Sequence, residues 1–281
     1  MLRDVQTILG DIDDAMRRVG AEDFEGALPI LARVVAFGPE EVSGPAYPVW
    51  ALCHVRLGRM ERALQIAEEG LARGILPGEM QLIRADALRV LERYDEAAAA
   101  AEAACALDPD SPAPLEMRAD IELDRGRPEA ALDLLLEARR RHPDDAGILA
   151  VLIEVADELH RHALVIEAAR DFLRKVGRDA EVLAALGRAY VETRDYRRAD
   201  RAFRDAAQLD PENVRHHISV LLVAVLTKND AAADAYLDRL GQRDPELSER
   251  AARGLDDVLA RVAGEETRRK RDRARRRPSR R

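Results

Sequence analysis

Small residues recur along this chain at an interval of 34 residues. Counting back and forward from Ala199, the interval reaches Ala63, Ala97, Ala131, Val165 and Ala233. Prolines keep a phase of their own at multiples of the same interval, at Pro109, Pro143, Pro211 and Pro245. A unit this short cannot bury its apolar faces alone, so its copies must stack against one another. The interval therefore predicts a linear array of repeats.

One copy, LAALGRAYVETRDYRRADRAFRDAAQLDP, shows what each unit contains. Leu183 and Tyr190 are seven residues apart and share one face of a first helix, and Ala199 and Phe203 share a face of a second. The short polar stretch between them predicts that the helices turn back on each other. Pro211 follows where the second helix must end, because proline lacks the N–H that continues a helix. Each unit is therefore predicted to be a helical hairpin.

Composition agrees with an all-α fold. Hydrophobic residues make up 47% of the 281 residues, but aromatic residues only 4%, and the apolar share is rich in the helix formers Ala and Leu. The two cysteines match no ligand spacing and are typical of a reducing compartment. The first residues contain acids where a signal peptide needs an apolar run, and no apolar stretch is long enough to span a bilayer. We expect a cytoplasmic protein.

The period and the order of residues within it resemble the tetratricopeptide repeat (TPR), with Leu183 in place of the usual Trp. The resemblance implies a right-handed superhelical solenoid of about seven helical hairpins followed by a capping helix. A divergent first repeat is expected over residues 1–43, and the regular array over residues 44–247. Its repeats are residues 44–77, 78–111, 112–145, 146–179, 180–213 and 214–247. Residues 146–179 are degenerate, because Val165 replaces the small residue and ELHRHAL replaces the usual turn.

The same resemblance implies a concave groove, lined by the first helix of each repeat, that binds a protein partner. The family's pattern assigns groove positions to the second, fifth, ninth, twelfth and thirteenth places of each repeat. The residues predicted to bind the partner are Asp86, Arg89, Glu116, Asp120, Asp124, Glu154, Asp157, Glu158, Arg188, Glu192, Leu222 and Val225. The middle of the groove is acidic and its ends are apolar, with Ile12 and Met16 at one end and Ile218, Leu222, Val225 and Leu226 at the other. Such a groove suits a partner with basic residues flanked by hydrophobic ones.

Other functions find less support in the sequence. TPR domains that bind the acidic tails of chaperones use basic and amide groups where this chain has Glu116, Asp120 and Glu154, which would repel a carboxylate. The six histidines lack the spacing that places two ligands on one helical face, so no metal site is predicted. Nucleotide-binding and hydrolase motifs are absent from the sequence. We therefore expect neither an enzyme nor a cofactor.

The chain ends in a capping helix, predicted over residues 248–264, and a basic tail, residues 265–281, predicted to be disordered. The tail carries ten basic and three acidic residues, a net charge of +7; since the whole chain carries −8, residues 1–264 carry −15. The predicted polyanion contacts are Arg268, Arg269, Lys270, Arg271, Arg275, Arg276 and Arg277. Three alternatives remain open for the tail. It binds nucleic acid or anionic lipid through charge, which would make the chain a nucleic-acid- or polyanion-associated protein; it occupies the groove of its own or another copy, which would allow a self-assembling scaffold; or it only solubilises the chain.

Overall fold

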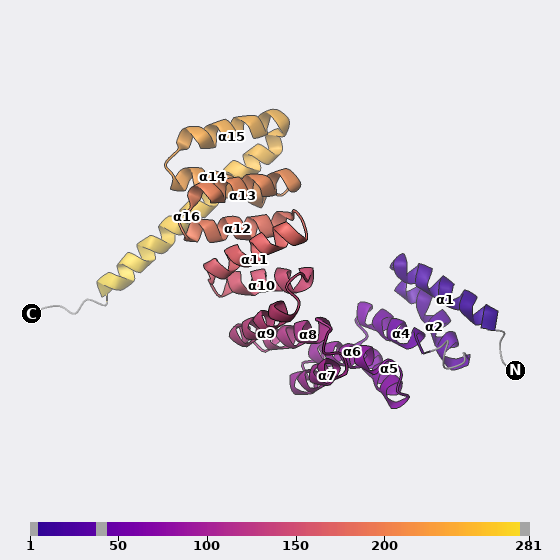
Figure 1. Ribbon diagram of the computed structural model, residues 1–281. Coiled ribbons are helices and arrows are strands. Elements are labelled where there is room, and N and C mark those ends of the chain that lie inside the picture. Colours follow the sequence, from indigo (N-terminus) through magenta and orange to yellow (C-terminus); the bar gives the residue numbers. More distant parts are fainter. Residues whose placement is uncertain (1–4, 38–43, 276–281) are drawn as a thin grey trace, which may run out of the picture. The chain divides into compact units, whose positions relative to one another are not determined.

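The computed structural model describes residues 5–37 and 44–275, and within these ranges it contains fifteen α-helices and no strand (Figure 1). The all-α prediction is confirmed. The helices are α1 (Val5–Gly20), α2 (Phe24–Phe37), α4 (Ala46–Arg56), α5 (Met60–Ala72), α6 (Pro77–Val90), α7 (Tyr94–Leu107), α8 (Ala113–Asp124), α9 (Pro128–Arg141), α10 (Ala146–Glu158), α11 (His162–Lys175), α12 (Ala180–Glu192), α13 (Tyr196–Leu209), α14 (Val214–Leu226), α15 (Asp230–Arg243) and α16 (Pro245–Arg275).

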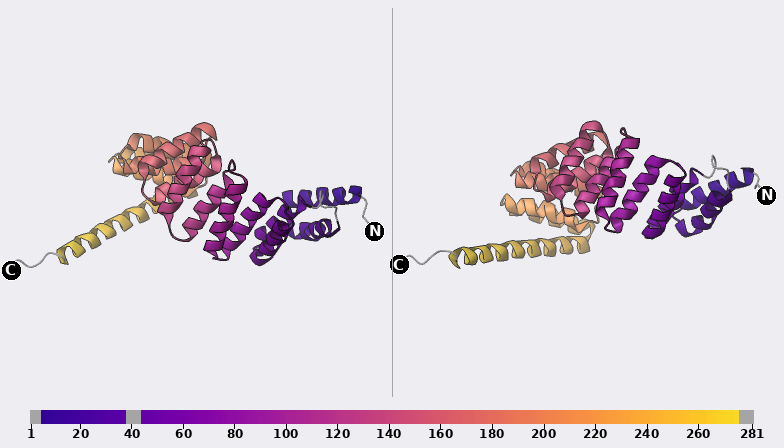
Figure 2. Two further views of the ribbon diagram at one scale, coloured as in Figure 1. Left: turned by 60° about the horizontal axis from the view of Figure 1, so that its bottom comes forward. Right: turned by 90° about the horizontal axis from the view of Figure 1, so that it is seen from below.

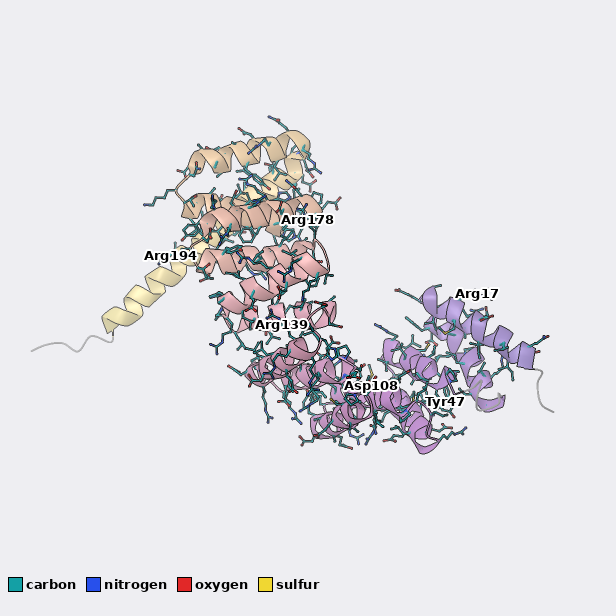
Figure 3. The ribbon with its side chains drawn as sticks, in the orientation of Figure 1. Arg17, Tyr47, Asp108, Arg139, Arg178 and Arg194 are labelled. Carbon is teal, nitrogen blue, oxygen red and sulfur yellow. The ribbon has the colours of Figure 1, made fainter. Side chains whose placement is uncertain are left out.

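The turns inside the hairpins share one backbone geometry. A residue with positive φ follows the first helix of each pair, at Glu22, Gly58, Glu92, Gly126, His160, Arg194 and Lys228. From Gly58 onward these residues keep the interval of 34 seen in the sequence. The next N–H bonds back to the carbonyl five residues earlier, as from Asp195 to Tyr190 at 2.8 Å, which is the Schellman ending of a helix. Figure 3 labels Arg194 in the turn between α12 and α13.

The degenerate repeat keeps this geometry. His160 takes the positive-φ place with φ 55°, and the N–H of Arg161 reaches the carbonyl of Ala156 at 2.7 Å. Val165, at the place of the usual small residue, is fully buried. The different residues of ELHRHAL therefore leave the backbone of the turn unchanged, because the turn is fixed by hydrogen bonds between main-chain groups that any residue carries.

Small residues let the two helices of a hairpin approach closely. A Cβ placed on Gly187 of α12 would lie 2.5 Å from Cε1 of Phe203 on α13. Ala199, on the same helix as Phe203, is fully buried. Larger side chains then fill the space around such contacts: Tyr47 of α4 is fully buried, and its hydroxyl donates to Glu69 Oε1 of α5 at 3.1 Å. The hairpin core is therefore built from alternating small and large residues.

The chain divides into two compact units, Met1–Ile148 and Leu149–Arg281. The division falls within α10, the first helix of the degenerate repeat. In the first unit, α1 and α2 form a helical hairpin within residues 1–43, where the sequence predicts a divergent first repeat. In the second unit, the hairpins α12–α13 and α14–α15 precede α16.

Helix α16 is longer than the predicted capping helix of residues 248–264. It begins at Pro245, where the side chain of Asp244 accepts from the N–H of Leu247 at 2.9 Å, and it runs to Arg275. The segment 265–275, expected to be disordered, is helical in the structure because Glu, Arg, Lys and Ala are good helix formers. Figure 2 shows these last turns extending clear of the other helices of the second unit. Residues 276–281 of the predicted tail lie outside the described residues.

Candidate functional site

The predicted groove residues lie on the first helices of successive hairpins. Helices α6 and α8 carry those of the first unit, and α10, α12 and α14 carry those of the second. The predicted groove residues are therefore divided between the two units.

In the first unit, Arg89 of α6 lies among the carboxylates. Its Nη2 donates to Asp86 Oδ1 at 2.8 Å and its Nη1 to Asp124 Oδ2 of α8 at 2.6 Å. Burial raises the pKa of Asp120 on α8, and Arg89 acts in the opposite direction while Asp124 and Asp86 raise it further. Arg89 thus offsets part of the negative charge that the sequence places here, and it links two successive repeats.

A second acidic contact of the first unit involves Glu116 of α8. Burial raises the pKa of Glu116, and repulsion from Asp145, a hydrogen bond to it and the charge of Asp120 add to the effect. Gly147 makes room for this carboxylate, since a Cβ there would lie 2.8 Å from Glu116 Oε1. Asp145 is meanwhile held by the N–H of Ile148 at 3.0 Å, at the start of α10. The carboxyl group of Glu116 therefore interacts with Asp145 and Asp120 of the protein itself.

The second unit contains a hollow between α10, α11 and α12 with a volume of about 330 Å³, which we call the α10–α12 hollow. Its apolar lining consists of Ala150, Ile153, Phe172, Val182 and Ala185. Ile153, Val182 and Ala185 expose less than a tenth of their surface, so they form a fixed floor. The apolar floor gives the hollow room for an aliphatic side chain.

Carboxylates surround this floor. Glu154 and Asp157 come from α10, Glu181 from α12, and Asp179 caps the N-terminus of α12 by accepting from the N–H of Val182 at 2.9 Å. Arg188 is the one cation of the lining, and its Nε and Nη2 donate to Asp157 Oδ2 at 2.9 and 2.8 Å. Four carboxylates against one guanidinium leave the hollow acidic.

The predicted groove residues make up only part of the lining of this hollow. Of the predicted groove residues, Glu154, Asp157 and Arg188 line it, whereas Glu158 and Glu192 are exposed on the same helices but do not line it. Ala150 and Glu181 also occupy groove places of the family's pattern and line the hollow, although neither was among the predicted binding residues. Ile153, Val182 and Ala185 fall outside the pattern, because an apolar residue facing a groove and one packed in the core look alike in a periodic pattern. Phe172 comes from a second helix, which the groove pattern ignores. Opposite charges at groove positions of successive repeats indicated that Arg188 could pair with a carboxylate of α10, but not that the partner is Asp157 rather than Glu154 or Glu158.

The apolar end of the predicted groove is partly covered. Leu222 and Val225 of α14 are half-buried against a cluster that includes Leu247 and Leu255 of α16. At the other end, in the first unit, Ile12 packs against the core while Met16 is 48% exposed. Contacts of Leu222 and Val225 with a partner stay a prediction.

The predicted polyanion contacts of the tail lie on the last turns of α16 or beyond it. Arg268, Arg269, Lys270, Arg271 and Arg275 fall within the helix. Arg276 and Arg277 lie outside the described residues. Binding of a polyanion through the tail stays a prediction.

Three family models, each described as tetratricopeptide repeat, match residues 49–112, 112–155 and 180–213. A solved structure of PilF from Pseudomonas aeruginosa is similar with a TM-score of 0.57 at 20% identity, over 76% of this chain and 97% of that one. MamA is similar with a TM-score of 0.55 at 17% identity, over 62% of this chain and 94% of that one. YrrB, a TPR protein, is similar with a TM-score of 0.52 at 16% identity, over 62% of this chain and 91% of that one. No curated protein sequence matches the chain.

The described residues contain neither a candidate membrane span nor a candidate metal cluster. None of their helices combines the length and the apolar character that crossing a bilayer requires. In the same part of the chain, no group of three or more His, Cys, Asp or Glu side chains is arranged to hold a metal ion.

Proposed function

Because the chain belongs to the tetratricopeptide-repeat family, whose members are protein-interaction scaffolds, we propose that it binds a basic and apolar segment of a partner protein in the α10–α12 hollow. The observation that carries the proposal is the combination of an apolar floor with an acidic rim in one hollow. The solved protein YrrB, which has the same fold, is described as having an unusual peptide-binding site. We further propose that the array acts by binding alone and catalyses no reaction.

The carboxylates that surround the floor favour a basic side chain as the ligand. Glu154 is exposed, and the side chain of Glu181 exposes 76% of its surface, so both carboxylates can accept from an arriving guanidinium or ammonium. Asp157 already has Arg188 as its partner, and this pair leaves less charge for a ligand. A basic side chain of the partner would therefore contact Glu154 and Glu181 while an adjacent aliphatic side chain covers the floor.

The test is a binding titration of the full chain with a fluorescent peptide of alternating arginine and leucine. A matched peptide of alternating glutamate and leucine serves as the probe of charge selectivity. We expect saturable binding of the basic peptide alone, weakened at least about tenfold by the double charge reversal Glu154→Lys and Glu181→Lys. Asp234→Lys, at an exposed position on α15, adds a positive charge elsewhere in the same unit and should leave the titration nearly unchanged.

A second variant tests the floor without changing any charge. Ala150 is half-buried at the edge of the hollow, so Ala150→Phe should fill it and weaken binding of the basic peptide. If both the charge reversal and Ala150→Phe bound the peptide as the unmodified protein does, with helical content unaltered, the hollow would not be the binding site.

A further inference from the structure

A second cavity of the second unit has the opposite charge. It lies among α13, α14 and α15, has a volume of about 340 Å³, and includes Arg204, Arg239 and Arg243 in its lining. We call it the Tyr236 pocket, after the aromatic residue that lines it with them. A cluster of three guanidinium groups is unexpected in a chain whose net charge is −8. None of the predicted groove positions lies in this pocket.

The floor of the pocket is held by a chain of hydrogen bonds. His217 of α14 is 4% exposed, and its Nε2 lies 2.9 Å from the carbonyl oxygen of Pro211 while its Nδ1 lies 2.8 Å from the hydroxyl of Tyr236. A carbonyl can only accept, so Nε2 carries a proton, and in the neutral imidazole Nδ1 accepts from Tyr236. Burial raises the pKa of Tyr236, so its hydroxyl stays protonated at neutral pH. The ring of Tyr236 is thereby fixed in place.

The ring in turn orients Arg204. The guanidinium carbon lies 5.1 Å from the centroid of Tyr236, and its Nε donates to Asp200 Oδ2 at 2.8 Å along the same helix. These two contacts fix the plane of the guanidinium and use only one of its nitrogens. The two terminal nitrogens of Arg204 are left to bind a ligand, and this preorganisation reduces the entropy lost on binding.

Arg239 and Arg243 supply the remaining charge. Both are exposed on α15, and neither has a carboxylate within ion-pair distance among the residues that the structure describes. Arg239 donates from Nε to the carbonyl oxygen of Ala235 at 2.9 Å, which again leaves its terminal nitrogens available. Since Asp200 offsets one of the three positive charges, the cavity carries a net charge of about +2.

We propose that the Tyr236 pocket binds a phosphate group, either free phosphate or a phosphomonoester. A net charge of about +2 matches the charge of such a group near neutral pH, and guanidinium groups bind phosphate oxygens with paired hydrogen bonds. Gln208 adds an amide to the lining, and Ala207 and Leu240 give it an apolar wall that suits the organic part of a monoester. The proposal is independent of the α10–α12 hollow and of the peptide it is proposed to bind.

The experiment titrates the full chain with inorganic phosphate, phenyl phosphate and sodium acetate at constant ionic strength, following the NMR shifts of arginine side-chain N–H groups. We expect both phosphates to saturate the same arginine signals and to compete with each other. Tighter binding of phenyl phosphate would identify a phosphomonoester as the ligand, equal binding would identify free phosphate, and both results support the site. Acetate binding as tightly as phosphate would overturn the assignment to phosphate.

Substitutions of the lining arginines test whether phosphate binds in the Tyr236 pocket. The double substitution Arg239→Gln and Arg243→Gln should weaken phosphate binding at least about tenfold, because each removes a charge-assisted hydrogen bond. Arg201→Gln removes an exposed arginine of α13 that does not line the pocket, and it is expected to have little effect. Circular dichroism checks that each variant keeps its helical content. Equal affinity in the double variant and the control would show that phosphate binds elsewhere and would overturn the proposal.

Discussion

Gly187 shows how one missing side chain sets the distance between two helices. A Cβ at this position would lie 2.5 to 2.8 Å from three atoms of the Phe203 ring, and Phe203 is 2% exposed, so the ring has little room to move. We expect Gly187→Ala to destabilise the second unit by about 1–3 kcal/mol through overpacking. Urea denaturation followed by circular dichroism measures the change.

Gly241 of α15 provides the matched control for this substitution. Its added Cβ would meet the nearest atom, Ser248 Oγ, at 3.5 Å, which is an ordinary contact. Gly241→Ala should therefore stabilise by up to about 1 kcal/mol through helix propensity. If the two substitutions changed stability in the same direction, the tight contact with Phe203 would not control the packing.

The raised pKa of Glu116 makes the free energy of unfolding depend on pH. Its pKa is raised above the ordinary value of 4.5, first by burial and then by Asp145 and Asp120, so the folded chain holds this proton more tightly than the unfolded chain. The contribution of the group to unfolding free energy is greatest below pH 4.5 and is lost as the pH rises through the raised pKa. Glu116→Gln cannot ionise and retains a donor for Asp145. Its stability relative to the unmodified protein should therefore increase as the pH rises above 4.5.

Denaturation with urea at a series of pH values measures this difference. Glu129→Gln, at an exposed position on α9, is the control for removing a carboxylate. A relative stability of Glu116→Gln that decreased with rising pH would contradict the assigned direction of the shift.

At the scale of elements, α16 combines two parts with different roles. Leu247, Ala251 and Leu255 pack against Leu221 of α14 and Leu240 of α15, so the first turns complete the core of the last hairpin. The segment after Gly264 continues the helix beyond the capping segment predicted from sequence. The core of the last hairpin and the basic segment thus share one helix.

We therefore expect the two ends of α16 to respond differently to change. Leu255→Ala should destabilise the last hairpin by about 2–4 kcal/mol, because it removes buried methyl groups and leaves a cavity. Deletion of residues 265–281 should leave that hairpin as protected as before. Amide hydrogen exchange of α14 and α15 distinguishes the two changes. Equal loss of protection in both would show that the basic segment contributes to the core.

At the scale of the whole molecule, the division into two compact units leads us to expect that a destabilising substitution in one unit affects that unit more than the other. In a repeat array, stability is approximately a sum of terms from each repeat and its nearest neighbours. Leu88 is fully buried in the first unit, and Leu221 in the second. Leu88→Ala should cost about 2–5 kcal/mol and accelerate hydrogen exchange in α6 and α7, with smaller changes in α12 and α13. Leu221→Ala should reverse the pattern. Uniform acceleration along the chain would indicate a single cooperative unit.

Much of the fold could be predicted from the sequence because the same helical hairpin recurs along the chain. The interval of 34 residues predicted the helical hairpins, and the positive-φ residues repeat with the same interval. The shared backbone of the turn at His160 could not be predicted from its residues, because its side chains differ from those of the other turns while its main-chain hydrogen bonds do not. The basic composition that indicated disorder for residues 265–281 consists largely of good helix formers, and residues 265–275 are helical in the structure.

The sequence by itself determined which face of each helix is apolar, because hydrophobic burial acts on residues three and four apart. It also placed acidic residues on the first helices. Only the tertiary structure decided which charges meet, since the pairs of Arg89 with Asp124 and of Arg188 with Asp157 join residues 35 and 31 apart. The α10–α12 hollow and the Tyr236 pocket likewise exist only where helices from different parts of the chain leave a space between their side chains. The sequence period fixes the helix face on which each side chain lies. A binding site also depends on the distances between side chains of different helices, and only the tertiary structure sets these.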